Sequence, residues 1–308
     1  MQEIDAVITV ESVTCNYGDF VAVDNLSLKV AKGELYALLG TNGAGKTTLV
    51  ETIEGHREAQ SGIVSVLGGA PADRVKVRPR VGMMLQDSGF AADLTASETL
   101  KLLGNLSGRT DNVQSVLDRV SLTEQMRVPV GQLSGGERRR LDFAAAVFGE
   151  PELLILDEPT NALDPEARDK LWVIVDELRS TGVTILLTTH YLEEAEEHAD
   201  RVGIMHQGRL RAEGSVRQLV GEFPARITFD SDFVPSDLPV PTFETNGQSV
   251  TVLTTELQRD LLRLLNWAED SALELRDLRA TPAGLAEAFR QVASHEHEPL
   301  ASRPADEA

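Results

Sequence analysis

Leu133-Ser134-Gly135-Gly136-Glu137 is a short run whose neighbours on both sides decide the fold class. Upstream of it, Gly40-Thr41-Asn42-Gly43-Ala44-Gly45-Lys46-Thr47 fits the P-loop pattern, in which spaced glycines precede Lys and Thr. Downstream, the apolar run Leu153-Leu154-Ile155-Leu156 ends in Asp157 and Glu158. A P-loop alone predicts only that a nucleoside triphosphate binds. The ordered series of three motifs predicts a much narrower class of protein.

The P-loop residues suit the phosphates of ATP. Glycines at 40, 43 and 45 let backbone N–H groups curl around phosphate oxygens, and the following helix points its positive end at them. Lys46 can reach the terminal phosphates, and the Thr47 hydroxyl can ligate Mg²⁺. The Lys-Thr ending argues against a simple glycine turn before a helix. We therefore predict an ATP site formed by Gly40, Asn42, Gly43, Ala44, Gly45, Lys46, Thr47 and Thr48.

Two adjacent carboxylates follow the apolar run 153–156, which is typical of a buried strand. Ligands of parallel α/β sheets bind at the carboxyl ends of the strands, where these acids are expected to emerge. Neighbouring side chains on a strand point to opposite faces, so Asp157 and Glu158 can serve different tasks. An exposed acidic turn is the alternative for such a pair without the other motifs.

The composition excludes several classes of protein. The chain has 308 residues, of which 42% are hydrophobic, as is ordinary for a protein with a full core. No stretch approaches the roughly 18 to 20 consecutive apolar residues of a membrane helix. The acidic start Met1–Asp5 lacks the features of a secretory signal. A single cysteine, Cys15, excludes an internal disulfide and fits a reducing compartment, so we expect a cytosolic protein.

The net charge of −20 disfavours nucleic acid as a main partner, because phosphate binding needs a basic surface. It also disfavours direct adhesion to anionic lipid, so we expect any membrane attachment to run through a protein partner. Arg138-Arg139-Arg140 is the one basic run near the motifs. We interpret it as a solvated or acid-paired helix face rather than a nucleic-acid patch.

Strand and helix patterns alternate through the first two thirds of the chain. Runs typical of strands occur at residues 8–10, 26–30, 35–39, 81–85, 153–156 and 183–188. Helical patterns occur at residues 47–54, 95–106, 111–120 and 135–147. The first two strands, separated by Gly18-Asp19, are predicted to pair, and the helices of about 87–140 to form an insert. The later alternation of strand and helix predicts an α/β fold with a parallel sheet.

The composition of the chain changes past Gly221, and residues 222–308 contain no lysine. Runs typical of strands occur at residues 225–229, 249–253 and 272–278, and an amphipathic helical pattern covers 256–267. Thr281-Pro282 predicts the start of another helix. We predict an ATP-binding domain at 5–221, a small α/β accessory domain at 222–293 and a disordered polar tail at 294–308.

The order of the motifs resembles the ATP-binding subunits of ABC transporters, over roughly residues 5–220. Within that family, the runs Tyr191–Arg201 and Thr160–Pro165 resemble the daunorubicin-type (ABC-2) drug-exporter ATPases. The resemblance implies a P-loop NTPase core with an N-terminal antiparallel β subdomain, a helical insert and a small C-terminal α/β domain. Thr41 stands where family members usually have Pro, and we expect little consequence.

The resemblance also assigns chemistry to single residues. It implies that Asp157 holds Mg²⁺ through water and that Glu158 is the base that activates the attacking water. Gln86 would touch Mg²⁺ and that water, and His190 would contact the γ-phosphate as a switch. Tyr17 would stack on adenine. A lone Gln, His or Tyr is more often solvated or structural, so the last three assignments depend on the series of motifs.

The run 133–137 distinguishes this family from other P-loop proteins. Ser134, Gly135 and Gly136 open a helix and form another anion-binding end. In the family this end caps the γ-phosphate of ATP held by the opposite subunit, so two subunits close around two ATP molecules. Glu137 stands in place of the usual Gln, a frequent variant. Asp164 matches the key residue of the loop through which the subunits communicate.

The resemblance implies a homodimer, or a heterodimer, of ATP-binding subunits on a separate polytopic permease at the cytoplasmic side of the membrane. A single motif set and a short segment 48–132 disfavour translation factors and DNA-repair proteins. We predict ATP-powered export of a drug or another amphipathic compound, with the cargo set by the permease. The alternative is a soluble ATP-dependent regulator that binds a protein partner through residues 222–308.

Overall fold

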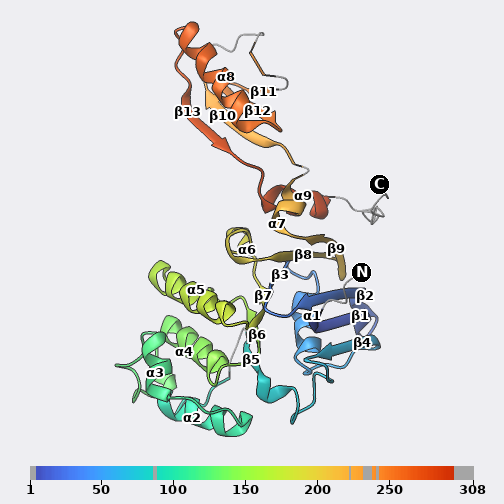
Figure 1. Cartoon of the computed structure of the whole chain (residues 1–308), viewed down its shortest axis with the longest axis vertical. Coiled ribbons are helices and arrows are strands. Elements are labelled where there is room, and N and C mark those ends of the chain that lie inside the picture. Colours follow the sequence, from blue (N-terminus) through green and yellow to red (C-terminus); the bar gives the residue numbers. More distant parts are fainter. Residues whose placement is uncertain (1–4, 86–88, 222, 232–237, 241–242, 295–308) are drawn as a thin grey trace. The chain divides into compact units, whose positions relative to one another are not determined.

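The computed structural model describes residues 5–85, 89–221, 223–231, 238–240 and 243–294. The chain divides into two compact units between Ser215 and Val216, a few residues before the boundary predicted at Gly221. Figure 1 shows the elements of both units. The first unit holds every motif singled out in the sequence.

A three-stranded antiparallel sheet begins the first unit. It has the order β2-β1-β4 and consists of β1 (Ala6–Tyr17), β2 (Phe20–Ala31) and β4 (Ser61–Val66). Ile8 pairs with Val30 and Val10 with Leu28, which confirms the predicted pairing. The buried face of these strands packs with helix α1 (Lys46–Ile53) in one apolar core. The sequence reading missed β4, an edge strand that begins with an exposed Ser-Gly pair.

A six-stranded sheet forms the centre of the unit, in the order β5-β6-β7-β3-β8-β9. Its strands are β3 (Leu35–Gly40), β5 (Val81–Met84), β6 (Leu153–Asp157), β7 (Thr184–Thr188), β8 (Arg201–His206) and β9 (Arg209–Gly214). All neighbours pair in parallel except β8 and β9, which are antiparallel. Every residue of β3, β6 and β7 is buried, which explains their continuous apolar sequences.

Helices cover the sheet and form the predicted insert. The helices of the first unit include α2 (Ala96–Ser107), α3 (Val113–Arg119), α4 (Gly135–Val147), α5 (Pro165–Ser180) and α6 (Leu192–His198). Figure 1 shows α2, α3 and α4 gathered away from β1, β2 and β4. Thr95 caps α2 in a reciprocal capping box with Glu98, and Gly108 ends it in a left-handed conformation.

The second unit is a four-stranded antiparallel sheet, in the order β11-β12-β10-β13, with helix α8 packed against it. Its elements are α7 (Val216–Val220), β10 (Ala225–Asp230), β11 (Phe243–Asn246), β12 (Ser249–Thr254), α8 (Leu257–Asp270), β13 (Arg276–Thr281) and α9 (Leu285–Ser294). Ile227, Phe229, Val250 and Val252 point into its core beside Leu264 of α8.

Two sequence predictions for the second unit were wrong. The last strand lies at Arg276–Thr281 rather than at 272–278, because Ala272 adopts a left-handed conformation in the turn after α8. Thr281 does not start a helix, since it pairs with Arg226 in the sheet, and α9 begins at Leu285. The tail predicted at 294–308 lies, apart from Ser294, outside the described residues.

No helix in the part of the chain that the structure describes is both long and apolar enough to cross a membrane.

Candidate nucleotide site

The P-loop connects the end of β3 to the start of α1, as predicted. Gly45 adopts φ +98°, and a Cβ at this position would lie 2.2 Å from the carbonyl oxygen of Ala22. Any other residue would therefore be both strained and in collision with the backbone of β2. The Lys46 ammonium donates to the carbonyl oxygen of Gly40 at 2.6 Å, which folds its side chain back over the loop. A phosphate would compete for this ammonium from the same side.

A cavity of about 290 Å³ opens over this loop. It brings together most of the predicted ATP residues with the two carboxylates and with Phe20 and Ala22 of β2. The lining residues are Tyr17, Phe20, Ala22, Thr41, Asn42, Gly43, Ala44, Gly45, Lys46, Thr47, Thr48, Asp157 and Glu158. Phe20 is 64% exposed and was not predicted; an exposed aromatic residue beside Gly18-Asp19 was the available signal. The cavity thus joins an apolar wall, a loop of backbone amides, one cation and two acids.

Tyr17 lies at the rim of this cavity, where an adenine base would need a flat partner. Tyr17 is 47% exposed, and the Arg57 guanidinium lies over its ring at 3.9 Å from the centroid. The guanidinium also pairs with Glu51. A nucleotide base would therefore meet Tyr17 on the face that Arg57 leaves open. This arrangement is compatible with the predicted stacking.

Asp157 ends β6 and is held by the neighbouring strand. Its Oδ1 accepts a hydrogen bond from the Thr188 hydroxyl at the end of β7. Only 8% of the residue is exposed, and this burial raises the pKa of its carboxyl, as does the nearby charge of Glu158. Burial lowers the pKa of Lys46, and the two acids oppose that shift. A site with two acids and one lysine favours a further cation.

The donor atoms fit Mg²⁺, which prefers oxygen ligands. The Thr47 hydroxyl and the buried Asp157 carboxylate both line the cavity, where the charges of Lys46 and Arg139 favour the ionised carboxylate and so oppose the rise of its pKa. A divalent cation beside it would offset both the burial and the repulsion from Glu158. Gln86, the third predicted ligand, lies outside the described residues.

Glu158 and His190 meet across two strand ends. The carboxylate Oε2 of Glu158 is hydrogen-bonded to Nδ1 of His190, and it also accepts from Asn161 Nδ2 at 3.2 Å. The backbone of Glu158 is left-handed, with φ +50°, which is uncommon for a residue other than glycine. Its N–H donates to the carbonyl oxygen of Thr188 at 2.9 Å. The local fold therefore directs this carboxylate toward the histidine.

Ser134, Gly135 and Gly136 lie at the start of α4, as predicted, but they do not line the cavity at the P-loop. Ser134 forms a reciprocal capping box with Glu137: its hydroxyl accepts from the Glu137 N–H at 3.3 Å, and the Glu137 carboxylate accepts from the Ser134 N–H at 2.8 Å. The hydrogen bonds that the Ser134 N–H and hydroxyl donate to the Glu137 carboxylate lower the pKa of Glu137. Asp164 caps α5 through the Ala167 N–H at 2.9 Å.

Of the two alternatives for Arg138-Arg139-Arg140, a solvated or an acid-paired helix face, the middle residue is not solvated: it is buried, with its guanidinium 4.0 Å from Asp142 Oδ2. Arg138 is exposed and Arg140 half-buried, whereas Arg139 is only 7% exposed. Its guanidinium donates to the carbonyl oxygens of Asp157 and Leu85, each at 2.8 Å. A run of three consecutive arginines does not indicate which of the three side chains is buried.

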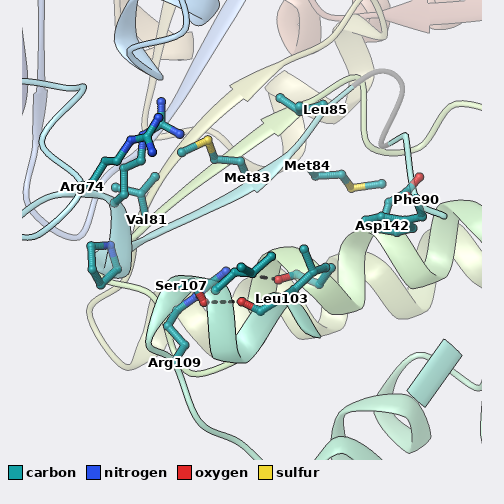
Figure 2. Close-up of a pocket in the computed structure, with 14 residues that line it drawn as sticks. Arg74, Val81, Met83, Met84, Leu85, Phe90, Leu103, Ser107, Arg109 and Asp142 are labelled. Carbon is teal, nitrogen blue, oxygen red and sulfur yellow. Dashed lines mark hydrogen bonds between the residues drawn. The ribbon is translucent and has the colours of Figure 1, made fainter. Parts of the chain in front are cut away.

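A second and larger hollow lies between the edge strand β5 and the helical insert. It has a volume of about 530 Å³. Figure 2 shows Met83, Met84 and Leu85 on one side of it and Leu103, Ser107 and Arg109 on the other. This surface, which we call the insert groove, is lined by Arg74, Arg78, Pro79, Val81, Met83, Met84, Leu85, Phe90, Leu103, Leu106, Ser107, Arg109, Asp142 and Ala145.

One further acid is buried behind the P-loop helix. Glu54 follows the last residue of α1, and only 2% of it is exposed. Burial raises its pKa to about 8, and the charges of Asp157 and Glu51 act in the same direction. His56 Nδ1 lies 3.3 Å from its Oε2, while Oε1 has no hydrogen-bond partner. The sequence reading did not single out this residue, because burial of a helix-end acid leaves no trace in composition.

The chain is similar to known proteins in both of its units. The ABC transporter family profile matches residues 23–161, and a profile described as the C-terminal domain of ABC transporter domain-containing protein-like sequences matches residues 225–284. The daunorubicin resistance ATP-binding protein DrrA3 of Streptomyces coeruleorubidus is 41% identical over 224 residues, which cover 71% of each chain. A Nod factor export ATP-binding protein I from Burkholderia lata is 38% identical over 221 residues, 70% of this chain and 73% of that one.

Solved structures agree with the fold. The ATP binding subunit of an ABC transporter superposes with a TM-score of 0.66 at 29% identity, over 69% of this chain and 91% of that one. A dimeric bacterial ABC transporter cassette, MJ0796, gives a TM-score of 0.61 over 68% of this chain and 98% of that one, at 24% identity. The chain therefore belongs to the ATP-binding ATPases of the ABC transporter family.

Proposed function

We propose that this ATPase powers export through a separate membrane permease. The observation that carries the proposal is the single cavity in which Lys46, Asp157 and Glu158 converge, with His190 bonded to Glu158. The names of the similar proteins, a drug resistance and a Nod factor export ATP-binding protein, support export rather than import. The cargo would be chosen by the permease that lines its path.

The roles within the site follow from the contacts. Lys46 would exchange its carbonyl partner Gly40 for the terminal phosphates of ATP. Thr47 and Asp157 would hold Mg²⁺, which supplies charge neutralisation on the phosphates when bound, and Gln86 would join them. Glu158 would orient the attacking water and accept its proton. Catalysis of this kind consists mostly of positioning and of stabilising charge.

A switch residue has to touch both the base and the phosphate. His190 hydrogen-bonds to Glu158, and its side chain is 48% exposed, so its remaining surface is available to a γ-phosphate. Its neighbour Tyr191 is held by a hydrogen bond from its N–H to Thr189 Oγ1 at 3.0 Å. We assign His190 to the γ-phosphate contact that hydrolysis removes.

The active unit proposed here is a dimer of two ATP-binding subunits. Ser134 and its helix start do not line the P-loop cavity of their own chain, and a helix N-terminus that begins with Gly135 and Gly136 is suited to an anion. In a closed dimer this helix start would cap the ATP bound to the other subunit. Asp164 caps α5 and lies three residues after Asn161, whose side chain donates a hydrogen bond to Glu158. Closure of the dimer at Asp164 would thereby be coupled to the position of the Glu158 carboxylate.

The insert groove is the surface we assign to the permease. It is apolar along Met83, Phe90 and Leu103, and it is rimmed by Arg74 and Arg78, in a chain whose net charge is −20. Leu106 at its edge is 75% exposed. A short amphipathic segment of a membrane protein would cover these apolar side chains. The subunit would thereby sit at the cytoplasmic side of the membrane without a span of its own.

Gentle detergent extraction of native membranes that contain the tagged chain tests this proposal. A polytopic membrane protein recovered in stoichiometric amount, together with ATP turnover by the purified complex, is the expected result. Recovery in the soluble fraction alone, with turnover but no membrane partner, would contradict the transport role. It would favour a regulator that acts on a soluble protein.

A further inference from the structure

Arg139 is a buried guanidinium that binds consecutive carbonyl groups after strand β6. Its Nη2 donates to Asp157 O at 2.8 Å and also to Glu158 O, and its Nε donates to Pro159 O at 3.3 Å. One side chain on α4 therefore holds the whole turn that carries the proposed base. Its residue exposure of 7% means that water does not compete for these bonds.

The turn needs such a constraint. Glu158 has φ +50°, and a non-glycine residue in this region costs about 1–3 kcal/mol and persists only where the surroundings over-determine it. On one side of the residue, the N–H is bound to the carbonyl oxygen and the hydroxyl of Thr188, at 2.9 and 3.2 Å. On the other side, the carbonyl is bound to Arg139. Both peptide groups that flank the Glu158 side chain are thus fixed.

The same guanidinium extends to the insert groove. Its Nη1 donates to Leu85 O at 2.8 Å and lies 4.0 Å from Asp142 Oδ2. Leu85 and Asp142 both line the insert groove (Figure 2). Arg139 is therefore in direct contact with the turn of the base and with the floor of the groove.

We infer that Arg139 is a positioning residue that holds Glu158 in the geometry needed for ATP hydrolysis. The same side chain connects the turn of Glu158 to Leu85 and Asp142, which line the insert groove. The inference rests on the proposed role of Glu158 as the base. Arg139 is not among the residues that line the cavity at the P-loop. Its effect is therefore expected on the rate of hydrolysis and not on the binding of nucleotide.

The test uses the full chain with Arg139→Lys, which keeps the positive charge and the buried stem but loses the planar fork that reaches several carbonyls. We expect kcat for ATP to fall by about tenfold or more, while KM stays within about threefold. Arg140→Lys is the matched control, since Arg140 is half-buried on the next position of α4 and donates to Ser121 O. It should keep kcat within about twofold.

A double-mutant cycle separates positioning of Glu158 from a general structural effect. In a Glu158→Gln background, Arg139→Lys should lower the residual rate by less than about twofold, because the residue that it positions has already lost its function. An equal loss in both backgrounds, or an unchanged kcat in Arg139→Lys alone, would overturn the inference. Thermal unfolding of each variant shows whether it is folded, and Arg139→Gln takes the place of the Lys variant if that one does not fold.

The two levels of the proposal fail in different ways. Normal turnover of Glu158→Gln would show that Glu158 is not the base, and the proposed catalytic assignment would fail. Normal turnover of Arg139→Lys beside an inactive Glu158→Gln would remove only the role of Arg139.

Discussion

The Nδ1 atom of His190 is hydrogen-bonded to the Oε2 atom of Glu158, across the ends of strands β7 and β6. The carboxylate is 16% exposed and the imidazole 48% exposed, so the acid is shielded while the histidine is open to a ligand. The pair links the proposed base to the proposed phosphate sensor. Its chemistry can be tested by changing the carboxylate alone.

Glu158→Gln should bind ATP normally and lose hydrolysis. The amide keeps the size of the side chain and can still bond to His190, but it cannot accept a proton from water. General-base catalysis is worth about 10² to 10⁴ in rate, so we expect kcat to fall by that range. Phosphate release measured with Mg²⁺-ATP checks the rate, and size-exclusion chromatography with ATP should show an accumulated dimer. Near-normal turnover would remove Glu158 from its role.

Ser134→Ala should lower both the stability of α4 and the activity of the dimer. Loss of a serine cap costs about 1 kcal/mol, because the Glu137 N–H loses its acceptor. Chemical unfolding measures this part. Activity provides the sharper test, in a mixed dimer with Ser134→Ala in one subunit and Lys46→Ala in the other. Both changes then fall in the same composite site, so the second site should stay intact and keep its activity. Thr95→Ala, which removes the equivalent cap of α2, controls for the loss of a helix cap.

Leu106→Asp should weaken attachment to the permease. The side chain is 75% exposed at the edge of the insert groove, so the change costs the isolated subunit little stability. An acid there would be left against the apolar part of the partner and would lower recovery of the complex by about tenfold or more, since burying an unpaired charge costs several kcal/mol. Val173→Asp, on an exposed position of α5, is the control and should co-purify normally.

Glu54→Gln should stabilise the protein at alkaline pH. The folded-state pKa of about 8 lies above the ordinary value of 4.5, so between these values the folded chain holds a proton that the unfolded chain has released. The free energy of unfolding of the wild type therefore falls as the pH rises from about 4.5 to about 8 and is flat above that window. We expect Glu54→Gln to raise it by roughly 1–3 kcal/mol at alkaline pH and to flatten the slope.

Urea unfolding across this pH range measures the effect. Glu58→Gln, on an exposed position of the same segment, controls for the loss of one negative charge. A wild-type slope that persists in Glu54→Gln would show that another group produces it.

Local patterns in the sequence predicted the elements that we expect to bind phosphate. Buried parallel strands read as continuous apolar runs. The structure adds capping boxes at Ser134–Glu137 and Thr95–Glu98, which were not predicted although their spacing is typical of that motif. The α/β class, the paired first strands and the start of α4 followed from the local patterns and were confirmed. Edge strand β4 was missed because Ile63 points to solvent and the strand lacks a strong alternation.

The remaining features depend on tertiary contacts. The inward direction of Arg139 is set by the rotation of α4 against β6, which three identical arginines do not encode. The raised pKa of Glu54 depends on how α1 packs. Thr281-Pro282 carries a valid helix-start signal, yet pairing of Thr281 with Arg226 in the sheet overrides it. The roles of the site residues remain predictions until they are tested.

The order of the central sheet has a consequence for synthesis of the chain on the ribosome. Strand β3, which leads into the P-loop, pairs on one side with β7 and on the other with β8, and these strands begin only at Thr184 and Arg201. The nascent chain therefore carries an apolar strand with two open edges while the whole helical insert is being made. Such non-local pairing is slow and prone to aggregation. The sheet that carries the P-loop can therefore close around β3 only after β7 and β8 have both been synthesised.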